Sequence, residues 1–324
     1  MLFEPSATVK IGFGGYSTVY KEIIPAGQFR YKAVSESATR LNDAPLPVAR
    51  KYFPYKPDFD RELEFLSTIT SAPNQGHERI VQYLAVVIYT QTSLPPTVGK
   101  YNLLFPLANC DLAQSFNTED FSRFELKHLI RELFHLADAL VYLHTSIKTS
   151  LGASLISSHM DLNPRNILIF RSDADNSPAG TWKITDFSTS TLMDENGHDI
   201  LSLPKLVPES YMAPEIQTPI GKNKADPACD IWSFGCIVFE VLLAHVEGVE
   251  CRSWKDKFGN PRCYYERKGN ALSVESRAWE WLNSDVGDEF MRMGKRVVMD
   301  MLTIEPRGRP TAEQVRDRLE MLLE

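Results

Sequence analysis

The stretch HMDLNPRN, from His159 to Asn166, places an aspartate and an asparagine five positions apart in a short polar segment. Leu162 and Pro164 frame a tight loop, since proline fixes its own backbone angle. Asp161 and Asn166 both carry side-chain oxygens that can hold a proton or a metal ion. The same eight residues could also form an incidental turn, so the neighbouring segments are needed to infer the role of the loop.

The composition bounds the class of protein. The chain has 324 residues, of which 43% are hydrophobic and 24% charged, as expected for a soluble globular protein with one or two lobes. A net charge of −7 argues against a chain-wide surface for nucleic acid or anionic membrane. The most apolar window, Asp230–Val246, is too short for a membrane span and predicts a buried helix. We therefore expect a protein that binds neither nucleic acid nor membrane.

The five cysteines and the N-terminus predict an intracellular location. No two cysteines form a C-x-x-C pair, and their number is odd, which argues against structural zinc or a disulfide framework. The opening MLFEPSATVKIG lacks the basic and apolar segments of a secretory signal. The expected compartment is the cytoplasm or the nucleus.

Two kinds of pattern divide the chain near residue 106. Short β-branched and aromatic runs predict strands at 7–13, 17–24, 47–53, 80–89 and 101–106, interrupted by one helix at Phe59–Ile69. Beyond Asp111 helical periodicity dominates, most clearly at Arg123–His144. The predicted class is α+β and bilobal, with a small antiparallel β-rich lobe (1–106) containing one helix, a hinge (107–110) and a larger, mainly helical lobe (111–324). Polar stretches at Ala33–Leu46, Thr145–Ser157 and Ser172–Gly180 are expected to be surface loops.

The segment Ile11–Tyr20 carries Gly12, Gly14 and, where a third glycine often stands, Ser17. A dinucleotide-binding glycine motif requires a helix directly afterwards. Here a strand pattern follows, so the glycines indicate the bend of a β-hairpin. Without Cβ atoms, backbone amides there can approach phosphate oxygens. A plain hairpin turn is the alternative.

Lys51 lies inside the apolar strand pattern PVARKYF. Such a lysine is usually exposed at a sheet edge. The functional alternative is an ammonium that grips phosphates and is held by a carboxylate. Of the two glutamates in the following helix, Glu62 adjoins the apolar packing face and is preferred to Glu64. Lys32 is the rival lysine.

Asp186 ends a strand pattern in WKITDFSTS, twenty residues after Asn166. Magnesium takes oxygen ligands, typically one or two carboxylates or amides together with substrate phosphates. Asn166 and Asp186 supply such oxygens. Asp161 is then free to orient an attacking hydroxyl and to accept its proton.

Two further charged groups have expected structural roles. Glu215, in YMAPE, and Arg309, in RGRPTAEQV, are expected to form a buried ion pair that clamps the segment after Asp186. Asp230 opens the apolar helix. It is either a plain N-cap or a group that holds the Asp161 loop from beneath.

Taken in order, these motifs resemble those of the eukaryotic protein kinases. GFGGYSTV, VARK, RELEFL, HMDLNPRNIL, TDFS, YMAPE, DIWSFG and RPT stand in the family's order over nearly the whole chain. The chain is also similar to kinase domains of filamentous fungi. The resemblance implies a kinase fold that binds ATP and Mg²⁺ and acts on a protein substrate, and we expect a monomer.

The resemblance assigns roles residue by residue. Lys51, steadied by Glu62, would hold the α- and β-phosphates, Asp161 would be the catalytic base, and Asn166 and Asp186 would bind magnesium. The remaining nucleotide contacts would be Gly12, Gly14 and Ser17 over the phosphates, Val19, Ala49 and Leu168 around adenine, Phe105 as gatekeeper, Leu107 in the hinge and Asp111 at the ribose.

Four departures from the family pattern bear on activity. Met160 replaces an arginine, Ser188 replaces the glycine after Asp-Phe, Asn163 replaces the lysine usual in serine/threonine kinases, and Pro208 replaces a threonine. Arg165 directly precedes Asn166, and an arginine at this position resembles the pattern of many tyrosine kinases. The acceptor residue therefore stays open.

Three functions follow from these observations. The first is a protein kinase acting on serine or threonine, with tyrosine or dual specificity left open. The second is a pseudokinase, a nucleotide-binding signalling scaffold without useful catalysis. A small-molecule kinase on the same fold is disfavoured, because YMAPE with its Arg309 partner belongs to the kinases of proteins.

Overall fold

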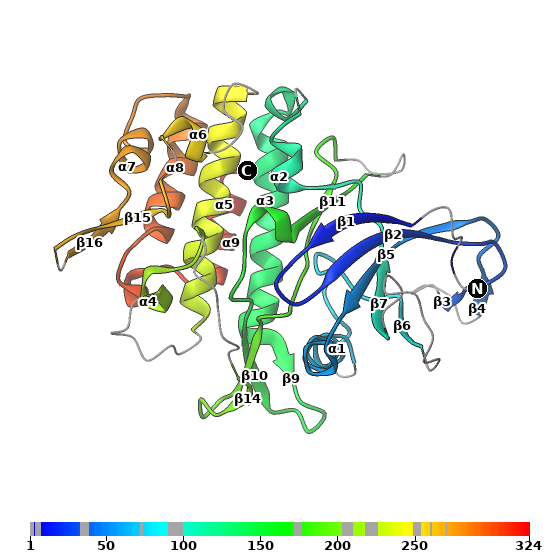
Figure 1. Ribbon diagram of the computed structural model, residues 1–324. Helices are drawn as coiled ribbons and strands as arrows, with labels where there is room; N and C mark the ends of the chain where they lie inside the picture. The colour runs from blue at the N-terminus through cyan, green and yellow to red at the C-terminus, as the bar shows by residue number, and fades with distance from the viewer. Residues whose placement is uncertain are drawn as a thin grey trace. The chain divides into compact units, whose positions relative to one another are not determined.

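The computed structural model divides the chain into two compact units (Figure 1). The first contains Met1–Thr70 and Val81–Ala108, and the second contains Ser71–Ile80 and Asn109–Glu324. The structure describes residues 3, 8–32, 39–71, 74–89, 100–118, 120–171, 177–202, 210–217, 226–248, 254–259, 261–269 and 271–324, without the side chains of 30–32, 39–41 and 256.

The first unit is built on an antiparallel sheet with the strand order β1-β2-β5-β7-β6. Its strands are β1 (Val9–Phe13), β2 (Thr18–Ile24), β5 (Leu46–Phe53), β6 (Ala85–Ile88) and β7 (Tyr101–Pro106), and β3 (Arg30–Lys32) pairs with β4 (Thr39–Leu41). The helix α1 (Lys56–Thr70) buries Phe59, Phe65, Leu66 and Ile69. The predicted β-rich unit with one helix is confirmed.

The register of the central strands sorts neighbouring residues of β5 onto opposite faces. Val19 pairs with Lys51, and Ala49 pairs with Phe105, so these side chains share one face of the sheet. Arg50 points to the other face. Both basic side chains are nevertheless buried, Lys51 at 5% exposure and Arg50 at 1%.

A buried polar network holds Arg50 on its face of the sheet. Its guanidinium donates to Glu22 Oε1 from Nε at 3.0 Å and from Nη2 at 2.8 Å, and to Asn102 Oδ1 at 2.8 Å. Thr8 donates a further hydrogen bond to Glu22 Oε2 at 2.8 Å. Beside the network lies an apolar cluster of Phe3, Ile24, Val48 and Leu104. The network joins β2, β5 and β7 on the side away from Lys51.

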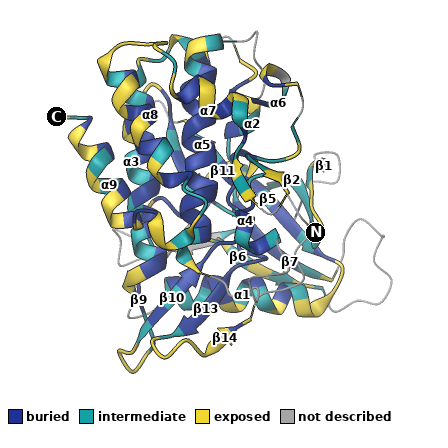
Figure 2. Ribbon diagram, turned by 90° about the vertical axis from the view of Figure 1, so that its left-hand side faces the viewer, coloured by how far each residue is buried: buried dark blue, intermediate teal, exposed yellow. Residues whose placement is uncertain are grey.

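The second unit is mainly helical around α5 (Pro227–Glu247). The other helices of this unit are α2 (Leu112–Ser115), α3 (Leu126–Val141), α4 (Pro214–Gln217), α6 (Trp254–Lys257), α7 (Ser276–Leu282), α8 (Glu289–Met301) and α9 (Ala312–Met321). Figure 2 shows α5 as a buried helix. By length and composition α5 would pass as a membrane span, but 89% of its apolar window is buried inside the protein. It is a core helix, as the sequence predicted.

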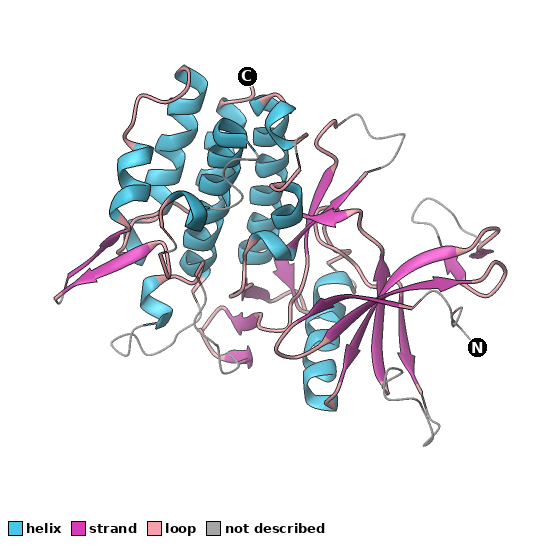
Figure 3. Cartoon of the chain, turned by 45° about the horizontal axis from the view of Figure 1, so that its top comes forward, coloured by secondary structure: helices cyan, strands magenta, loops and turns pink. Residues whose placement is uncertain are grey.

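Short strands complete the second unit (Figure 3). One sheet has the order β12-β11-β8, another has the order β14-β13-β10-β9, and β15 pairs with β16. Their bounds are β8 (Cys110–Asp111), β9 (Ile147–Lys148), β10 (Ser154–Ser158), β11 (Ile167–Phe170), β12 (Thr181–Ile184), β13 (Thr191–Asp194), β14 (Asp199–Leu201), β15 (Tyr265–Lys268) and β16 (Ala271–Val274).

Two sequence expectations about secondary structure were wrong. The stretch Thr145–Ser157, expected to be a surface loop, contains β9 and most of β10, and the Ser157 side chain is fully buried. The strand expected at 80–89 forms only at Ala85–Ile88. Residues 172–176 of the third polar stretch lie outside the described residues.

The segment Ser71–Ile80 belongs to the second unit, although it lies within the range that the sequence assigned to the first lobe. The Asn74 amide exchanges two hydrogen bonds with the backbone of Lys148, at 2.6 and 2.7 Å. Arg79 forms an ion pair with the buried Glu132 of α3. Ile80 bridges to Ile184 of β12. These polar contacts join residues distant in sequence, which local patterns do not predict.

The core of the second unit contains a carboxyl group, that of Glu240 on α5. The Tyr211 hydroxyl donates to its two oxygens, each at 3.0 Å. Burial raises the pKa of Glu240 to about 7, and the hydrogen bond from Tyr211 only partly opposes that shift. Burial therefore keeps the carboxyl group mainly neutral at pH values below about 7.

Removing the Glu22 carboxylate should destabilise the first unit. We expect Glu22→Ala to lower the free energy of unfolding by about 3 kcal/mol, because it leaves the buried Arg50 charge without its carboxylate. Urea titration measures the change. The matched control is Asp60→Ala, which removes an exposed ion pair with Lys56 and should leave stability near wild type. An equal loss in both variants would contradict the prediction.

Stability should fall as pH rises because of Glu240. Its folded pKa of about 7 exceeds the ordinary value of 4.5, so the folded state binds the proton more tightly. This contribution is complete below pH 4.5 and is lost as pH rises through 7. As pH rises from 5 to 8, the free energy of unfolding of wild type should fall by about 2 kcal/mol relative to that of Glu240→Gln, which has no carboxyl group to ionise. Parallel pH profiles of unfolding free energy for the two proteins would refute this.

Candidate functional site

The glycine segment forms the bend between β1 and β2. Gly12 pairs with Val19, and the amide of Gly14 donates to the Ser17 carbonyl at 3.0 Å, which closes the turn. A Cβ atom on Gly14 or Gly15 would meet nothing within 4 Å, so these positions leave open space above the backbone. The hairpin reading is confirmed, and the helix required by a dinucleotide-binding motif is not there. The Ser17 side chain is buried.

Lys51 and Glu62 form a buried ion pair between β5 and α1. The ammonium donates to Oε1 at 2.7 Å and to Oε2 at 2.6 Å, and both side chains are almost fully buried. Glu64, the other candidate, is exposed, and the side chain of the rival Lys32 lies outside the described residues. Glu62 faces the sheet because it shares the buried face of α1.

The residues expected around adenine come from both units. Val19, Ala49 and Phe105 share the Lys51 face of the first unit's sheet, on β2, β5 and β7. Leu107 follows β7. In the second unit Leu168 of β11 pairs with Asp111 of β8.

Asp111 has a structural role in addition to the expected one at the ribose. Its carboxylate caps α2 by accepting the amide proton of Gln114 at 2.7 Å. Burial raises the pKa of Asp111, while the hydrogen bond from Gln114 and the charge of Arg165 act in the opposite direction. The carboxylate is therefore fixed in place by the start of a helix.

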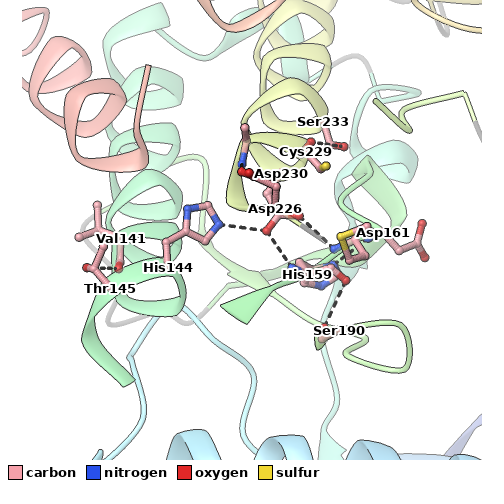
Figure 4. A network of polar contacts seen from close by, with 12 residues as sticks. Val141, His144, Thr145, His159, Asp161, Ser190, Asp226, Cys229, Asp230 and Ser233 are labelled. Carbon is pink, nitrogen blue, oxygen red and sulfur yellow. Dashed lines mark hydrogen bonds and ion pairs between the residues drawn. The ribbon is translucent and has the colours of Figure 1, made fainter. Parts of the chain in front are cut away.

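The loop of the opening motif is held from beneath by Asp230 (Figure 4). Its carboxylate accepts the amide protons of His159 at 2.8 Å and Met160 at 3.0 Å. His144 Nε2 lies 3.0 Å from the same carboxylate. Met160 adopts a left-handed backbone with φ 69°, which non-glycine residues rarely do. The second of the two roles considered for Asp230 is confirmed, and the N-cap of α5 is Asp226.

Both carboxylate oxygens of Asp161 accept hydrogen bonds from amides of the same loop. Asn163 Nδ2 donates to Oδ1 at 3.1 Å, and Asn166 Nδ2 donates to Oδ2 at 3.0 Å. The same two amides also donate to the Asp161 carbonyl, at 3.1 and 2.8 Å. Asn163 in turn accepts the amide proton of Arg165, which starts the 3-10 turn that carries Asn166. The carboxylate is therefore oriented by neutral donors.

Asp186 is joined to this loop through the backbone. The Thr185 amide donates to the Asn166 carbonyl at 3.0 Å, and His159 Nε2 lies 2.9 Å from the Thr185 carbonyl. Asp186 itself is left-handed, with φ 64°. Ser188, at the position of the family's glycine, donates from Oγ to Asp186 Oδ1 at 2.8 Å. The serine thus adds a hydrogen bond that glycine could not make.

The donor set around this loop fits a hard cation. The Asn166 amide nitrogen is used by Asp161, which leaves its amide oxygen for a ligand, and Asp186 supplies a carboxylate. Among the described residues no three histidine, cysteine, aspartate or glutamate side chains gather as a metal site. A cation here would therefore depend on phosphate oxygens as further ligands.

The expected pair of Glu215 and Arg309 is confirmed. Arg309 donates from both terminal nitrogens, at 2.6 Å to Oε1 and 2.8 Å to Oε2. It also donates to the carbonyls of Thr303, Ile304 and Ala228. Pro208 lies outside the described residues.

Two polar contacts of the site are not predicted by the sequence motifs. The motifs identify Asn163 only as a missing lysine and Ser188 only as a missing glycine, yet each donates to a carboxylate of the candidate site. The signal was available in principle, because asparagine and serine commonly bond to groups two residues away.

The comparisons with known proteins agree on one family. The chain is 26% identical over 198 residues to mouse ribosomal protein S6 kinase alpha-4, which covers 60% of the chain and 22% of that protein. It is 25% identical to mouse dual specificity protein kinase CLK1, over 45% of the chain and 29% of that protein. It is 26% identical to rabbit MAP kinase-activated protein kinase 2, over 54% of the chain and 40% of that protein. The matched part is thus less than half of each relative. The finer similarity to fungal kinases stays a prediction.

The family assignment covers almost the whole chain. Residues 6–318 match the protein kinase domain family. The match covers most of both units, and the β5–α1 ion pair and the loop of Asp161 lie inside it. The chain belongs to the protein kinase domain family.

Proposed function

We propose that the chain is an active protein kinase that transfers the γ-phosphoryl group of ATP to serine or threonine hydroxyls of a protein. The observation that carries the proposal is the Asp161 carboxylate, which is oriented through both oxygens by Asn163 and Asn166. A general base must lie within hydrogen-bond reach of the proton that it removes from the acceptor hydroxyl. A carboxylate that accepts a hydrogen bond at each oxygen has the fixed orientation that this role requires.

In the proposed mechanism the residues of this chain bind, orient and accept a proton. Lys51 contacts the α- and β-phosphates while Glu62 holds its ammonium, and the open backbone around Gly14 lies along the phosphates. Asp161 orients the acceptor hydroxyl and receives its proton. Magnesium, when bound with ATP, would neutralise phosphate charge, and Asn166 and Asp186 would hold it.

The acceptor preference is the finer part of the proposal. The resemblance to the protein kinase family favours serine or threonine as the acceptor. Against this, Asn163 replaces the usual lysine, and Arg165 stands where many tyrosine kinases have an arginine. One relative is named a dual specificity kinase. The competing hypothesis of a scaffold without catalysis gains no support from the relatives. Phosphoamino-acid analysis of the product distinguishes serine, threonine and tyrosine.

The remaining nucleotide contacts and the cellular location are also proposals. Val19, Ala49 and Leu168 enclose adenine, Phe105 is the gatekeeper, Leu107 lies in the hinge, Asp111 meets the ribose and Ser17 lies with the glycines. The four described cysteines are free thiols, which fits a reducing cytoplasm or nucleus.

Loss of the proposed base should abolish transfer but spare binding. Asp161→Asn is expected to lower kcat about 10³-fold, because the amide cannot accept the proton. Incorporation of ³²P from [γ-³²P]ATP into myelin basic protein measures kcat, and a thermal shift with ATP and Mg²⁺ measures binding. Asp120→Asn changes an exposed aspartate of the same unit and is the control. Full activity of Asp161→Asn would sink the proposal.

Asn163 should affect kcat rather than the KM for ATP. Asn163→Ala removes a neutral hydrogen bond to Asp161 and is expected to lower kcat about tenfold. Asn163→Lys brings a cation towards the developing phosphate charge and should raise kcat about tenfold above wild type. Steady-state kinetics at saturating ATP measure both. A lysine variant slower than the alanine variant would contradict the electrostatic argument.

A further inference from the structure

The hairpin of β15 and β16 forms an isolated two-stranded sheet in the second unit. It projects from the helices of that unit (Figures 1 and 3). The motifs of the proposed mechanism do not use it. A two-stranded hairpin alone is marginally stable in water, so its position depends on how its base is anchored.

Aromatic packing anchors the base of the hairpin in the core. Tyr264, directly before β15, is fully buried and stacks on Trp254 with ring centroids 3.8 Å apart. Phe239 of α5 meets it edge-on at 5.7 Å. The next residue, Tyr265, packs against Trp232 of α5 at 6.3 Å. The hairpin is therefore a fixed platform on α5 rather than a loose loop.

The hairpin and its base carry an excess of positive charge in an acidic protein. Between Trp254 and Arg277 the sequence has six basic and three acidic residues, whereas the whole chain has a net charge of −7. Three of the basic residues are paired with carboxylates, since Lys257 pairs with Glu247, Lys268 with Glu266 and Arg277 with Glu275.

Two exposed arginines remain without a carboxylate partner in the described part of the chain, Arg262 and Arg267. Both guanidinium groups act on the hydroxyl of Tyr265. Burial and the neighbouring Cys263 raise the pKa of that phenol to about 12, while Arg267 and Arg262 act to lower it. The two positive charges therefore lie within electrostatic reach of the same aromatic ring.

The hairpin also offers backbone and apolar contacts. Tyr265 pairs with Val274 and Arg267 pairs with Leu272, so these four side chains share one face. Within the described residues neither outer edge of the hairpin has a partner strand. An open strand edge presents free amides and carbonyls that an extended peptide can use.

We propose that the hairpin face of Tyr265, Arg267, Leu272 and Val274, together with the neighbouring Arg262, binds an extended acidic segment of a protein substrate. Its carboxylates would pair with the two guanidinium groups, and its backbone would pair with the strand edge. This inference rests on the proposed kinase function only in calling the partner a substrate. The strand edge favours a peptide over a lipid surface or a nucleic acid, and so does the net negative charge of the chain.

Binding of a labelled peptide tests the surface directly. The probe is a fluorescein-labelled peptide of alternating glutamate and serine, with a lysine–serine peptide as the reversed-charge probe, followed by fluorescence anisotropy. The double variant Arg262→Glu with Arg267→Glu should weaken binding of the acidic peptide about tenfold or more, which corresponds to the loss of one good contact. The lysine peptide should not bind to wild type.

The matched control changes the same charge elsewhere. Lys127→Glu with Arg131→Glu alters two exposed basic residues one turn apart on α3 and should leave peptide affinity within about twofold of wild type. The milder double variant Arg262→Gln with Arg267→Gln removes the same two charges without reversing them, and it should also weaken binding of the acidic peptide if the glutamate variant has not simply misfolded. Absent binding to wild type, or equal loss in the α3 control, would overturn the proposal. So would hairpin-dependent binding to phosphatidylserine vesicles without binding to the peptide.

A kinetic arm separates failure of the surface from failure of the kinase function. Wild type should phosphorylate a substrate peptide fused to the acidic segment with a lower KM than the unfused peptide, at similar kcat. The hairpin variant should lose this difference and keep its rate on the unfused peptide. Peptide binding without any phosphorylation would refute the kinase proposal alone, whereas phosphorylation with equal KM values would refute the docking surface alone.

Discussion

The hydrogen bonds from the loop amides to Asp230 are the contact on which the candidate site of the second unit depends. Met160 has a backbone conformation that a non-glycine residue adopts only when its surroundings impose it. Asp230, buried on α5, imposes it by accepting the amides of His159 and Met160. Asp161 follows directly, so the direction of its carboxylate is set by the most buried helix of the unit. A buried core helix thus fixes the geometry of a loop that is itself mostly buried.

In the first unit a single strand, β5, carries two buried basic residues. Lys51 and Arg50 are adjacent on β5, point to opposite faces and are both buried. A buried charge is costly unless it is paired, so each has its own carboxylate, Glu62 from α1 and Glu22 from β2. Such pairs fix geometry more than they add stability. Here they fix the rotation of α1 and the register of β2 on the strand that presents Lys51.

The ion pairs of the site could be predicted from sequence, whereas its neutral hydrogen bonds could be anticipated only as a general tendency of asparagine and serine. Lys51 with Glu62 and Glu215 with Arg309 join opposite charges inside recognisable motifs. The bonds that Asn163 and Ser188 make depend on donor positions within a few tenths of an ångström, which only the folded loop supplies. Likewise the serine and threonine content of Thr145–Ser157 predicts a loop, yet its last residues form a strand that buries Leu155 and Ser157 in the core.

Asn163 and Ser188 have the same physical consequence for the proposed chemistry. Each donates a neutral hydrogen bond that orients a carboxylate, Asn163 to Asp161 and Ser188 to Asp186. An oriented carboxylate suits the proposed base at Asp161 and the proposed metal ligand at Asp186. Neither neutral group can balance charge on a transferred phosphoryl group, however. That stabilisation must then come from Lys51, the metal ion and the backbone amides near the glycines, so the rate should depend more heavily on them than in a kinase with a lysine at position 163.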